Sequence, residues 1–219
     1  MNIAIDGPAG AGKSTIAKKL AKDLGYIYVD TGAMYRAMAL YFLERAIPAL
    51  DKTAVCGLAD GIDISILYQD GQQQVLLNGE NVNDKIRRED VGNMASAISV
   101  YPAVRQKLVA LQQKIAKTAD VIMDGRDIGT CVLPDAEVKI YLTASPYTRA
   151  KRRFDELKEK GEGCDLSAIQ KDIEERDFRD MHRAASPLKQ ADDALLIDSS
   201  ELGIDEVVEA IRKICRERQ

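Results

Sequence analysis

The chain has 219 residues, with 31 Lys and Arg against 35 Asp and Glu, and a net charge of −4. This length suits one domain of ordinary size with room for a small insertion. With 46% hydrophobic and 30% charged residues, the composition is that of a soluble globular protein. The acidic balance argues against a duplex nucleic-acid partner. The longest apolar run, Ala37 to Leu43, is far below the roughly 18 residues that span a bilayer, so we expect no membrane partner.

The cysteines favour a cytoplasmic protein. They occur at positions 56, 131, 164 and 215, far apart and without a C-x-x-C pair. Such spacing fits neither a disulfide framework nor a zinc site, and it suits a reducing compartment. The first residues also lack the basic flank and apolar stretch of a secretory signal. A single histidine, His182, argues against His-dependent catalytic triads and His-rich metal sites.

Short apolar strands alternate with helical periods through most of the chain, which predicts an α/β fold with a central parallel sheet and helices on both faces. The predicted elements are, in chain order, a strand at 3–5, a helix from about 13 to 24 closed by Gly25, a strand at 26–29, a helix around 35–42, an antiparallel stretch at 62–77, helices at 91–98 and 102–115, strands at 121–123 and 138–142, a helical pair to 183, a strand at 195–197 and a helix at 204–214.

The antiparallel stretch interrupts the parallel pattern. Residues 62–66 alternate strictly between apolar and polar, and Asp70-Gly71 and Asn78-Gly79 are turn dipeptides. We therefore expect one domain over 1–219, made of a core (1–60, 88–147 and 184–219), an antiparallel insert of about 61–87 and a helical lid with its following helix at about 148–183.

The first strand leads into a complete phosphate-binding motif, G-x-x-x-x-G-K-[ST]. Its residues and the next one are Gly7, Pro8, Ala9, Gly10, Ala11, Gly12, Lys13, Ser14 and Thr15. Glycines let successive backbone N–H groups point at a phosphate, and the following helix adds its positive dipole end. Lys13 would reach the β- and γ-phosphates of ATP, and the Ser14 hydroxyl would ligate Mg²⁺. The motif predicts a P-loop nucleoside triphosphate site.

Other parts of the sequence narrow the class of P-loop protein. The guanine-reading tetrapeptide Asn-Lys-x-Asp of Ras-like GTPases is absent. Ligands of an open parallel sheet collect beyond the carboxyl ends of its strands, and Asp30 to Arg36 and Asp124 to Gly129 follow two such ends. Asp124 is placed like the acidic residue that holds Mg²⁺ through water in P-loop enzymes.

The segment from Arg149 to Arg183 contains ten basic and ten acidic residues. Many of these will form ion pairs along solvated helices. Arg149, Arg152 and Arg153 nevertheless share one helix face, and phosphoryl transfer needs arginines to neutralise the transferring group. With a bend at Gly161-Glu162-Gly163, the helical pair is typical of a lid that closes over ATP.

Four motifs together resemble the bacterial cytidylate kinases, P-loop kinases of nucleoside monophosphates. They are the runs Ile5 to Thr15, Asp30 to Arg36, Asp124 to Thr130 and Glu175 to Leu188, supported by the step Pro102 to Arg105. The resemblance covers essentially the whole chain, and in that family the antiparallel insert forms part of the CMP-binding region. It implies ATP-dependent phosphorylation of CMP, with dCMP as a second acceptor, and Mg²⁺ bound with ATP.

The resemblance also assigns roles to individual residues. Thr31, Arg105 and Asp127 would surround the cytosine, and Arg36 and Arg126 would hold the CMP phosphate. Ser96, Arg176 and Asp180 would lie around the ribose, and Arg183 near the phosphates. Lys13, Arg126, Arg149, Arg152, Arg153 and Arg183 then form the expected catalytic set.

The chemistry of cytosine agrees with a carboxylate and a guanidinium or hydroxyl around the base. Cytosine offers an N4 donor beside N3 and O2 acceptors, whereas the O4 of uracil would leave Asp127 facing an oxygen. A kinase of UMP, AMP or a non-nucleotide acceptor, and a regulatory nucleotide-binding module without transfer activity, remain alternatives. We expect a monomer with small-molecule partners only.

Overall fold

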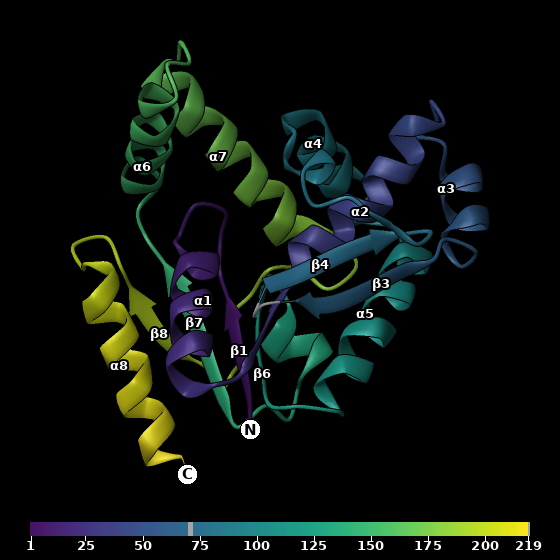
Figure 1. The fold of residues 1–219 in the computed structure, drawn as a ribbon. Coiled ribbons are helices and arrows are strands. Elements are labelled where there is room, and N and C mark those ends of the chain that lie inside the picture. The colour runs from purple at the N-terminus through teal and green to yellow at the C-terminus, as the bar shows by residue number, and fades with distance from the viewer. Residues whose placement is uncertain (70–71, 219) are drawn as a thin grey trace. The chain divides into compact units, whose positions relative to one another are not determined.

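The computed structural model describes residues 1–69 and 72–218 (Figure 1). The chain forms two compact units. The first unit joins Met1–Tyr26 to Asp120–Gln219, and the second unit is Ile27–Ala119. The predicted insert lies within the second unit, and the predicted lid lies within the first.

The sheet of the first unit is parallel. Its strands are β1 (Asn2–Asp6), β6 (Val121–Gly125), β7 (Val138–Thr143) and β8 (Leu195–Asp198), in the spatial order β6-β1-β7-β8. In the register of β1, Ile3 lies opposite both Ile122 and Val138. Ile3, Ala4 and Ile5 are fully buried, so both faces of β1 are covered. A strand buried on both faces has a continuous apolar sequence, which is why these positions were predictable.

The helices of the first unit are α1 (Lys13–Leu24), α6 (Pro146–Glu159), α7 (Leu166–His182), α8 (Ile204–Glu217) and the short π-helix η2 (Ile128–Val132). Helix α1 packs on β6 and against α8. It ends as predicted at Gly25, whose φ of 72° is left-handed and whose N–H donates to the carbonyl of Ala21.

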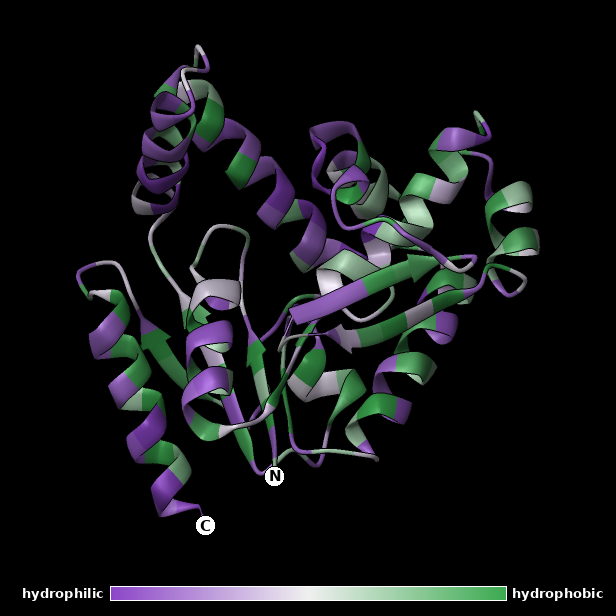
Figure 2. Ribbon diagram, in the orientation of Figure 1, coloured by the Kyte–Doolittle hydropathy of each residue, from purple (hydrophilic) through white to green (hydrophobic). Residues whose placement is uncertain are grey.

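Helices α6 and α7 form the predicted charged pair, and both are largely hydrophilic in Figure 2. The Ser145 hydroxyl caps α6 by accepting the N–H of Thr148, and the Asp165 carboxylate caps α7 by accepting that of Ala168. Gly161 has a left-handed φ of 75° in the connection between them. The predicted glycine bend between two helices is therefore present.

The second unit contains the antiparallel sheet. The elements of this unit are β2 (Ile27–Asp30), α2 (Thr31–Glu44), α3 (Lys52–Ala59), β3 (Ile64–Gln69), β4 (Gln72–Leu77), β5 (Glu80–Asn81), the 3₁₀ turn η1 (Lys85–Arg87), α4 (Glu89–Ile98) and α5 (Pro102–Ala116). Strands β3, β4 and β5 pair antiparallel in that order. Asn78 and Gly79 have φ values of 49° and 83°, which confirms the second predicted turn. The predicted turn at Asp70-Gly71 lies outside the described residues.

The fold class predicted from the sequence is confirmed, since the chain contains a parallel sheet with helices and a separate small antiparallel sheet. The elements that were not predicted include α3, β5, η1 and η2. In η2 the carbonyl of Asp127 accepts the N–H of Cys131 at 2.9 Å and that of Val132 at 3.2 Å. Over residues 1–69 and 72–218, every helix is too short or too polar to cross a bilayer.

Candidate active site

The loop between β1 and α1 has a backbone that only glycine permits at its ends. Gly7 has a φ of 148°, and a Cβ atom there would lie 1.9 Å from the carbonyl oxygen of Leu142 on β7. Gly12, just before α1, is left-handed with a φ of 88°. A chain so folded turns its N–H groups toward one centre at a helix N-terminus, which is an anion-binding geometry. The strand, loop and helix predicted for the P-loop are thus present.

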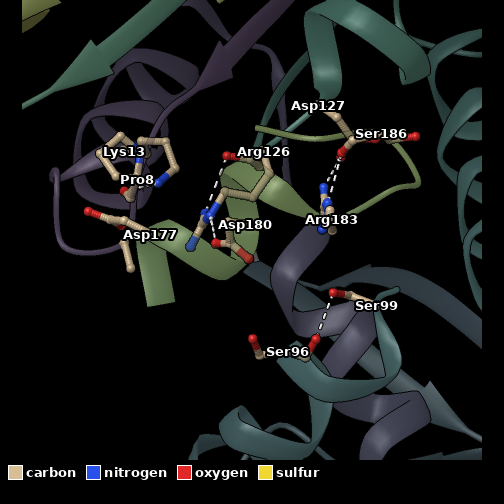
Figure 3. A network of polar contacts seen from close by, with 12 residues as sticks. Pro8, Lys13, Ser96, Ser99, Arg126, Asp127, Asp177, Asp180, Arg183 and Ser186 are labelled. Atoms are coloured by element: carbon tan, nitrogen blue, oxygen red, sulfur yellow. Dashed lines mark hydrogen bonds and ion pairs between the residues drawn. The ribbon is translucent and has the colours of Figure 1, made fainter. Parts of the chain in front are cut away.

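Lys13 begins α1 and is 5% exposed. Its Nζ donates to the carbonyl of Pro8 at 2.7 Å, across the loop (Figure 3). Burial and the nearby Arg126 lower the pKa of Lys13, whereas Asp124 and Asp6 act in the opposite direction. A phosphate bound in the loop would supply further negative charge and favour the ammonium form.

Ser14 and Asp124 bring hard oxygen atoms together at the loop. The Ser14 hydroxyl donates to Oδ2 of Asp124 at 2.8 Å, and Asp124 is buried at the end of β6. Within the described residues, groups of three or more His, Cys, Asp or Glu that could hold a metal ion are absent. Mg²⁺ usually binds through one or two protein oxygens plus phosphates and water, so this hydroxyl–carboxylate pair fits it.

Arg126 and Asp180 form a shielded ion pair next to the loop. Nε of Arg126, just after β6, donates to Oδ2 of Asp180 on α7 at 2.8 Å. Burial alone would raise the pKa of Asp180, but Arg126, Arg176 and Arg183 together hold it below its usual value. The carboxylate therefore stays ionised and orients the guanidinium of Arg126 (Figure 3).

Asp127 and Arg183 form a second pair. Nη2 of Arg183 lies 3.4 Å from Oδ1 of Asp127, and both side chains are less than a tenth exposed. Nε of Arg183 also donates to the carbonyl of Ser186 at 2.8 Å (Figure 3). The C-cap residue of α7, Arg183, is thereby tied to the segment that follows β6.

Asp6, the last residue of β1, was assigned no role from the sequence. Its Oδ1 accepts the N–H of Ile128 and its Oδ2 accepts the N–H of Gly129, both at 2.7 Å. Asp6 is 4% exposed, and burial raises its pKa to about 6 despite these two hydrogen bonds. A buried carboxylate thus holds the start of η2.

Arg149 is bound on every side by groups of the first unit. Its guanidinium donates to the carbonyls of Ala144 and Ala9, each at 2.9 Å, and to Oδ2 of Asp177 at 2.6 Å. The residue is 3% exposed. Oδ1 of Asp177 is buried and accepts no hydrogen bond from the described residues. Arg149 thus joins the P-loop to α7.

The two other predicted lid arginines have partners different from those of Arg149. Nη2 of Arg152 donates to the carbonyl of Ser199 at 2.7 Å. Arg153 is half-exposed and pairs with Glu156 at 3.0 Å. Arg176, on α7, influences the pKa values of both Lys13 and Asp180, which places its charge close to the phosphate loop.

Four of the predicted CMP residues belong to the second unit. Thr31 opens α2 and is buried, and Arg105 of α5 lies buried with its Cζ 5.8 Å from the centre of the Tyr35 ring. Arg36 donates to the carbonyl of Ile86 at 3.2 Å. The carbonyl of Ser96 accepts the hydroxyl of Ser99. These residues offer guanidinium and hydroxyl groups from three helices.

The structure brings together the predicted residues of the first unit, namely Lys13, Ser14, Asp124, Arg126, Asp127, Arg176, Asp180 and Arg183. It adds two carboxylates, Asp6 and Asp177. A polar residue that ends an otherwise apolar strand immediately before a P-loop was the available signal for Asp6.

The site has the parts of a P-loop kinase. A phosphate loop with a buried lysine lies at the end of a parallel sheet, beside a hydroxyl–carboxylate pair and clustered arginines. The fold is similar to that of an uncharacterized protein from Eubacterium ventriosum, with a TM-score of 0.54 and 14% identity over 98% of this chain and 97% of that one. A shikimate kinase from Bacteroides thetaiotaomicron matches with a TM-score of 0.50 and 14% identity, over 99% and 98% of the two chains. These likenesses show the fold alone.

Sequence comparison identifies the family. The family model described as cytidylate kinase matches residues 3–217. A cytidylate kinase from Lactobacillus johnsonii is 51% identical over 219 residues, which are 100% of this chain and 95% of the relative. One from Caldicellulosiruptor saccharolyticus is 53% identical over 214 residues, 98% and 95% of the two chains. The chain belongs to the cytidylate kinase family.

Proposed function

We propose that this protein transfers the γ-phosphoryl group of ATP to the 5′-phosphate of CMP, and also of dCMP, giving ADP and CDP or dCDP. Family membership over nearly the full chain supports this acceptor. The observation that carries the transfer chemistry is the P-loop itself, whose buried Lys13 lies in the field of Asp124, Arg126 and Arg176. ATP and CMP or dCMP are its proposed partners, and we propose a cytoplasmic monomer.

The donor side would be held by the P-loop. Its backbone N–H groups, those of Gly7 and of Ala9 to Thr15, would surround the β-phosphate, and Lys13 would contact the β- and γ-phosphates. Ser14 would bind Mg²⁺ directly and Asp124 through water. When bound, Mg²⁺ would neutralise charge on the β- and γ-phosphate oxygens.

The acceptor would be held by the following residues. Thr31, Arg105 and Asp127 would bind the cytosine, Arg36 and Arg126 the CMP phosphate, and Ser96, Arg176 and Asp180 the ribose. Arg183 would lie near the phosphates. Asp180 already orients Arg126 through a 2.8 Å hydrogen bond, which supports a preorganised phosphate contact.

The mechanism requires positioning and charge neutralisation more than proton transfer. A phosphate oxygen of CMP is a competent nucleophile at neutral pH, so a strong general base is unnecessary. In-line transfer spreads charge over the equatorial oxygens of the γ-phosphoryl group, and Lys13, Arg126 and Arg183 would stabilise that charge. Arg152 and Arg153 would join them from α6 when the lid closes, and Arg149 would act by supporting the loop.

Selection of cytosine over uracil would follow from the polarity of Asp127. An ionised carboxylate accepts a hydrogen bond from the N4 amino group of cytosine but repels the O4 of uracil. A mismatched buried polar group costs about 1–3 kcal/mol, which is a ten- to hundredfold preference.

A turnover assay with MgATP and a panel of acceptors tests the proposal. We expect the highest kcat/KM with CMP, activity with dCMP, and weaker activity with UMP and AMP. Preference for UMP, AMP or a non-nucleotide acceptor would refute the assignment of the substrate. Binding of ATP without turnover on any acceptor would instead indicate the regulatory module.

A further inference from the structure

Burial of the Asp6 carboxylate costs free energy, and the phosphate-binding motif does not require this residue. It precedes the motif and is buried at 4% exposure, in a position where an ionised carboxylate is poorly solvated. Burial raises its pKa to about 6, and the negative charge of Asp127 acts in the same direction. We therefore looked for hydrogen bonds that only a carboxylate at this buried position could make.

Two backbone N–H groups donate to the Asp6 carboxylate from the same turn. The N–H groups of Ile128 and Gly129 point at separate oxygens of Asp6, each at 2.7 Å. Only a carboxylate offers an acceptor to both donors, because an asparagine would turn an NH₂ group toward one of them. Asp6 therefore matches the first turn of η2 in a way that no amide can reproduce.

The turn that Asp6 holds has little freedom to shift. A Cβ atom at Gly129 would lie 3.2 Å from Cδ of Lys139 and 3.4 Å from Oδ2 of Asp6, so the backbone fits closely between these two side chains. Lys139 is itself fixed by hydrogen bonds to Asp193. The turn is thus held by the end of β1 and by β7.

Asp127 is attached directly to this turn. Its carbonyl accepts the N–H groups of Cys131 and Val132, so its backbone is the first anchor of η2. Its side chain contacts Arg183 at 3.4 Å. A shift of η2 would therefore move the carboxylate proposed to read the base, and π-helical turns of this kind often occur at functional sites.

We infer that Asp6 is a positioning residue for acceptor selection, which acts through η2 to hold the Asp127 carboxylate where it distinguishes cytosine from uracil. This inference rests on the proposed function. It links the strand that ends in the P-loop to the reading of the base, and it assigns a specificity role to a residue outside the phosphate-binding motif.

The test compares Asp6→Asn with Gly129→Ala and a stability control. Asp6→Asn replaces one acceptor by a donor, and Gly129→Ala displaces the same turn while keeping Asp6. Val208→Ala, a buried position on α8, lowers stability without touching η2. For each variant, kcat and KM are measured for ATP, CMP and UMP, with melting temperature and amide exchange at Ile128 and Gly129.

We expect Asp6→Asn to raise KM for CMP roughly tenfold or more, as expected for loss of one buried hydrogen bond, with a smaller change in KM for ATP. The ratio of kcat/KM for UMP to that for CMP should rise several-fold. Gly129→Ala should move both quantities in the same direction, and exchange at Gly129 should accelerate. Val208→Ala should lower the melting temperature and leave these ratios unchanged.

Two results separate this inference from the proposed function. If Asp127→Asn changes the UMP to CMP ratio but Asp6→Asn and Gly129→Ala behave like Val208→Ala, the role of Asp6 is refuted and base reading by Asp127 stands. If Asp127→Asn leaves the ratio unchanged, base reading by Asp127 is refuted, and the selectivity role of Asp6 with it.

Discussion

Three arginines near the phosphate loop each have a carboxylate partner. Arg126 pairs with Asp180, Arg149 with Asp177 and Arg183 with Asp127. Such pairs fix the planar guanidinium groups before a ligand arrives, since a carboxylate binds them with defined geometry. Removal of one partner would leave an uncompensated buried charge, which is usually more damaging than the pair is stabilising.

Lys13 is the residue whose loss should affect turnover most directly. We predict that Lys13→Ala lowers kcat on the order of 10²–10³-fold while changing CMP binding far less, because its contact with the β–γ bridge strengthens as charge develops there. Lys13→Met, which keeps most of the apolar stem, should show the same loss with less change in stability. Steady-state kinetics with near-normal turnover for either variant would refute the site.

Asp127 should control the identity of the base. We predict that Asp127→Asn raises the ratio of kcat/KM for UMP to that for CMP by about tenfold, because an amide can donate to O4 of uracil. Asp205→Asn, an exposed position that pairs with Lys19, is the matched control and should leave the ratio unchanged. If the ratio of kcat/KM for UMP to that for CMP stays constant or falls, the assignment of Asp127 as the base-reading residue is contradicted.

Asp6 should make stability depend on pH in a recognisable way. Its pKa is about 6 in the folded protein and 3.8 in an unfolded chain, so the folded state binds more protons between these values. Its contribution to stability is therefore complete below pH 3.8 and is lost as the pH rises through about 6. Two pKa units correspond to roughly 3 kcal/mol.

Denaturant unfolding of the wild type and Asp6→Asn from pH 4 to pH 7 measures this effect, because contributions from other groups cancel in the difference. We expect the wild type to lose free energy of unfolding relative to Asp6→Asn across this range. The charges of Lys13 and Asp127 also act on this carboxylate, and the opposite slope would show that the attraction of Lys13 outweighs the effect of burial.

Site residues that belong to short sequence motifs, such as Lys13, Ser14 and Asp124, could be predicted from the sequence. It predicted no role for Asp6 or Asp177, because their partners are backbone N–H groups 122 and 123 residues away and an arginine on another helix. Arg149 was predicted as a lid residue, but which groups surround it depends on how the end of β7 meets the P-loop.

At the scale of elements, α6 and α7 are the segments expected to move. We predict that hydrogen exchange over 149–165 slows more with a non-hydrolysable ATP analogue and CMP together than with CMP alone, because closure adds contacts to the γ-phosphate. The insert around 62–83 should respond mainly to CMP.

The comparison is sharpest with each ligand added alone and then together. Exchange over α8 provides an internal control, since that helix packs on α1 and β7 and is not expected to close over ATP. Equal responses of the lid and the insert to every ligand would contradict the division into a donor-side lid and an acceptor-side insert.

Elements were predictable where periodicity and caps agree with the fold. Helix α1 and its Gly25 end are one case, and the Asn78-Gly79 turn is another. Helix α3 was missed because Lys52–Ala59 contains Thr53, Val55 and Gly57, which are weak helix formers. Its Asp51 cap was the available signal. The π-turn η2 was missed because its support comes from Asp6 and Lys139, which are distant in sequence.

At the scale of the whole molecule, the first unit is assembled from both ends of the chain. Strand β1 pairs with β6, in which Val121 lies opposite Asn2, whereas contacts such as β3 with β4 join near neighbours in sequence. Pairings between distant residues form slowly because a long loop must be closed first.

We therefore predict an order of folding. In pulsed hydrogen-exchange refolding, amides of β3 and β4 should become protected before those of β1 and β6. Ile3→Ala should slow the later phase, and Val75→Ala, which is also buried, should affect the earlier one. Simultaneous protection of both pairs of strands would contradict this order.

The same connectivity has a consequence on the ribosome. Residues of β1 emerge before those of their partner strands β6 and β7, which begin at positions 121 and 138. Because translation adds about 5–20 residues per second, the apolar run Ile3 to Ile5 has no neighbouring strand for roughly ten seconds. During that interval the nascent chain presents an unpaired apolar strand, which is the kind of segment that chaperones of growing polypeptides shield.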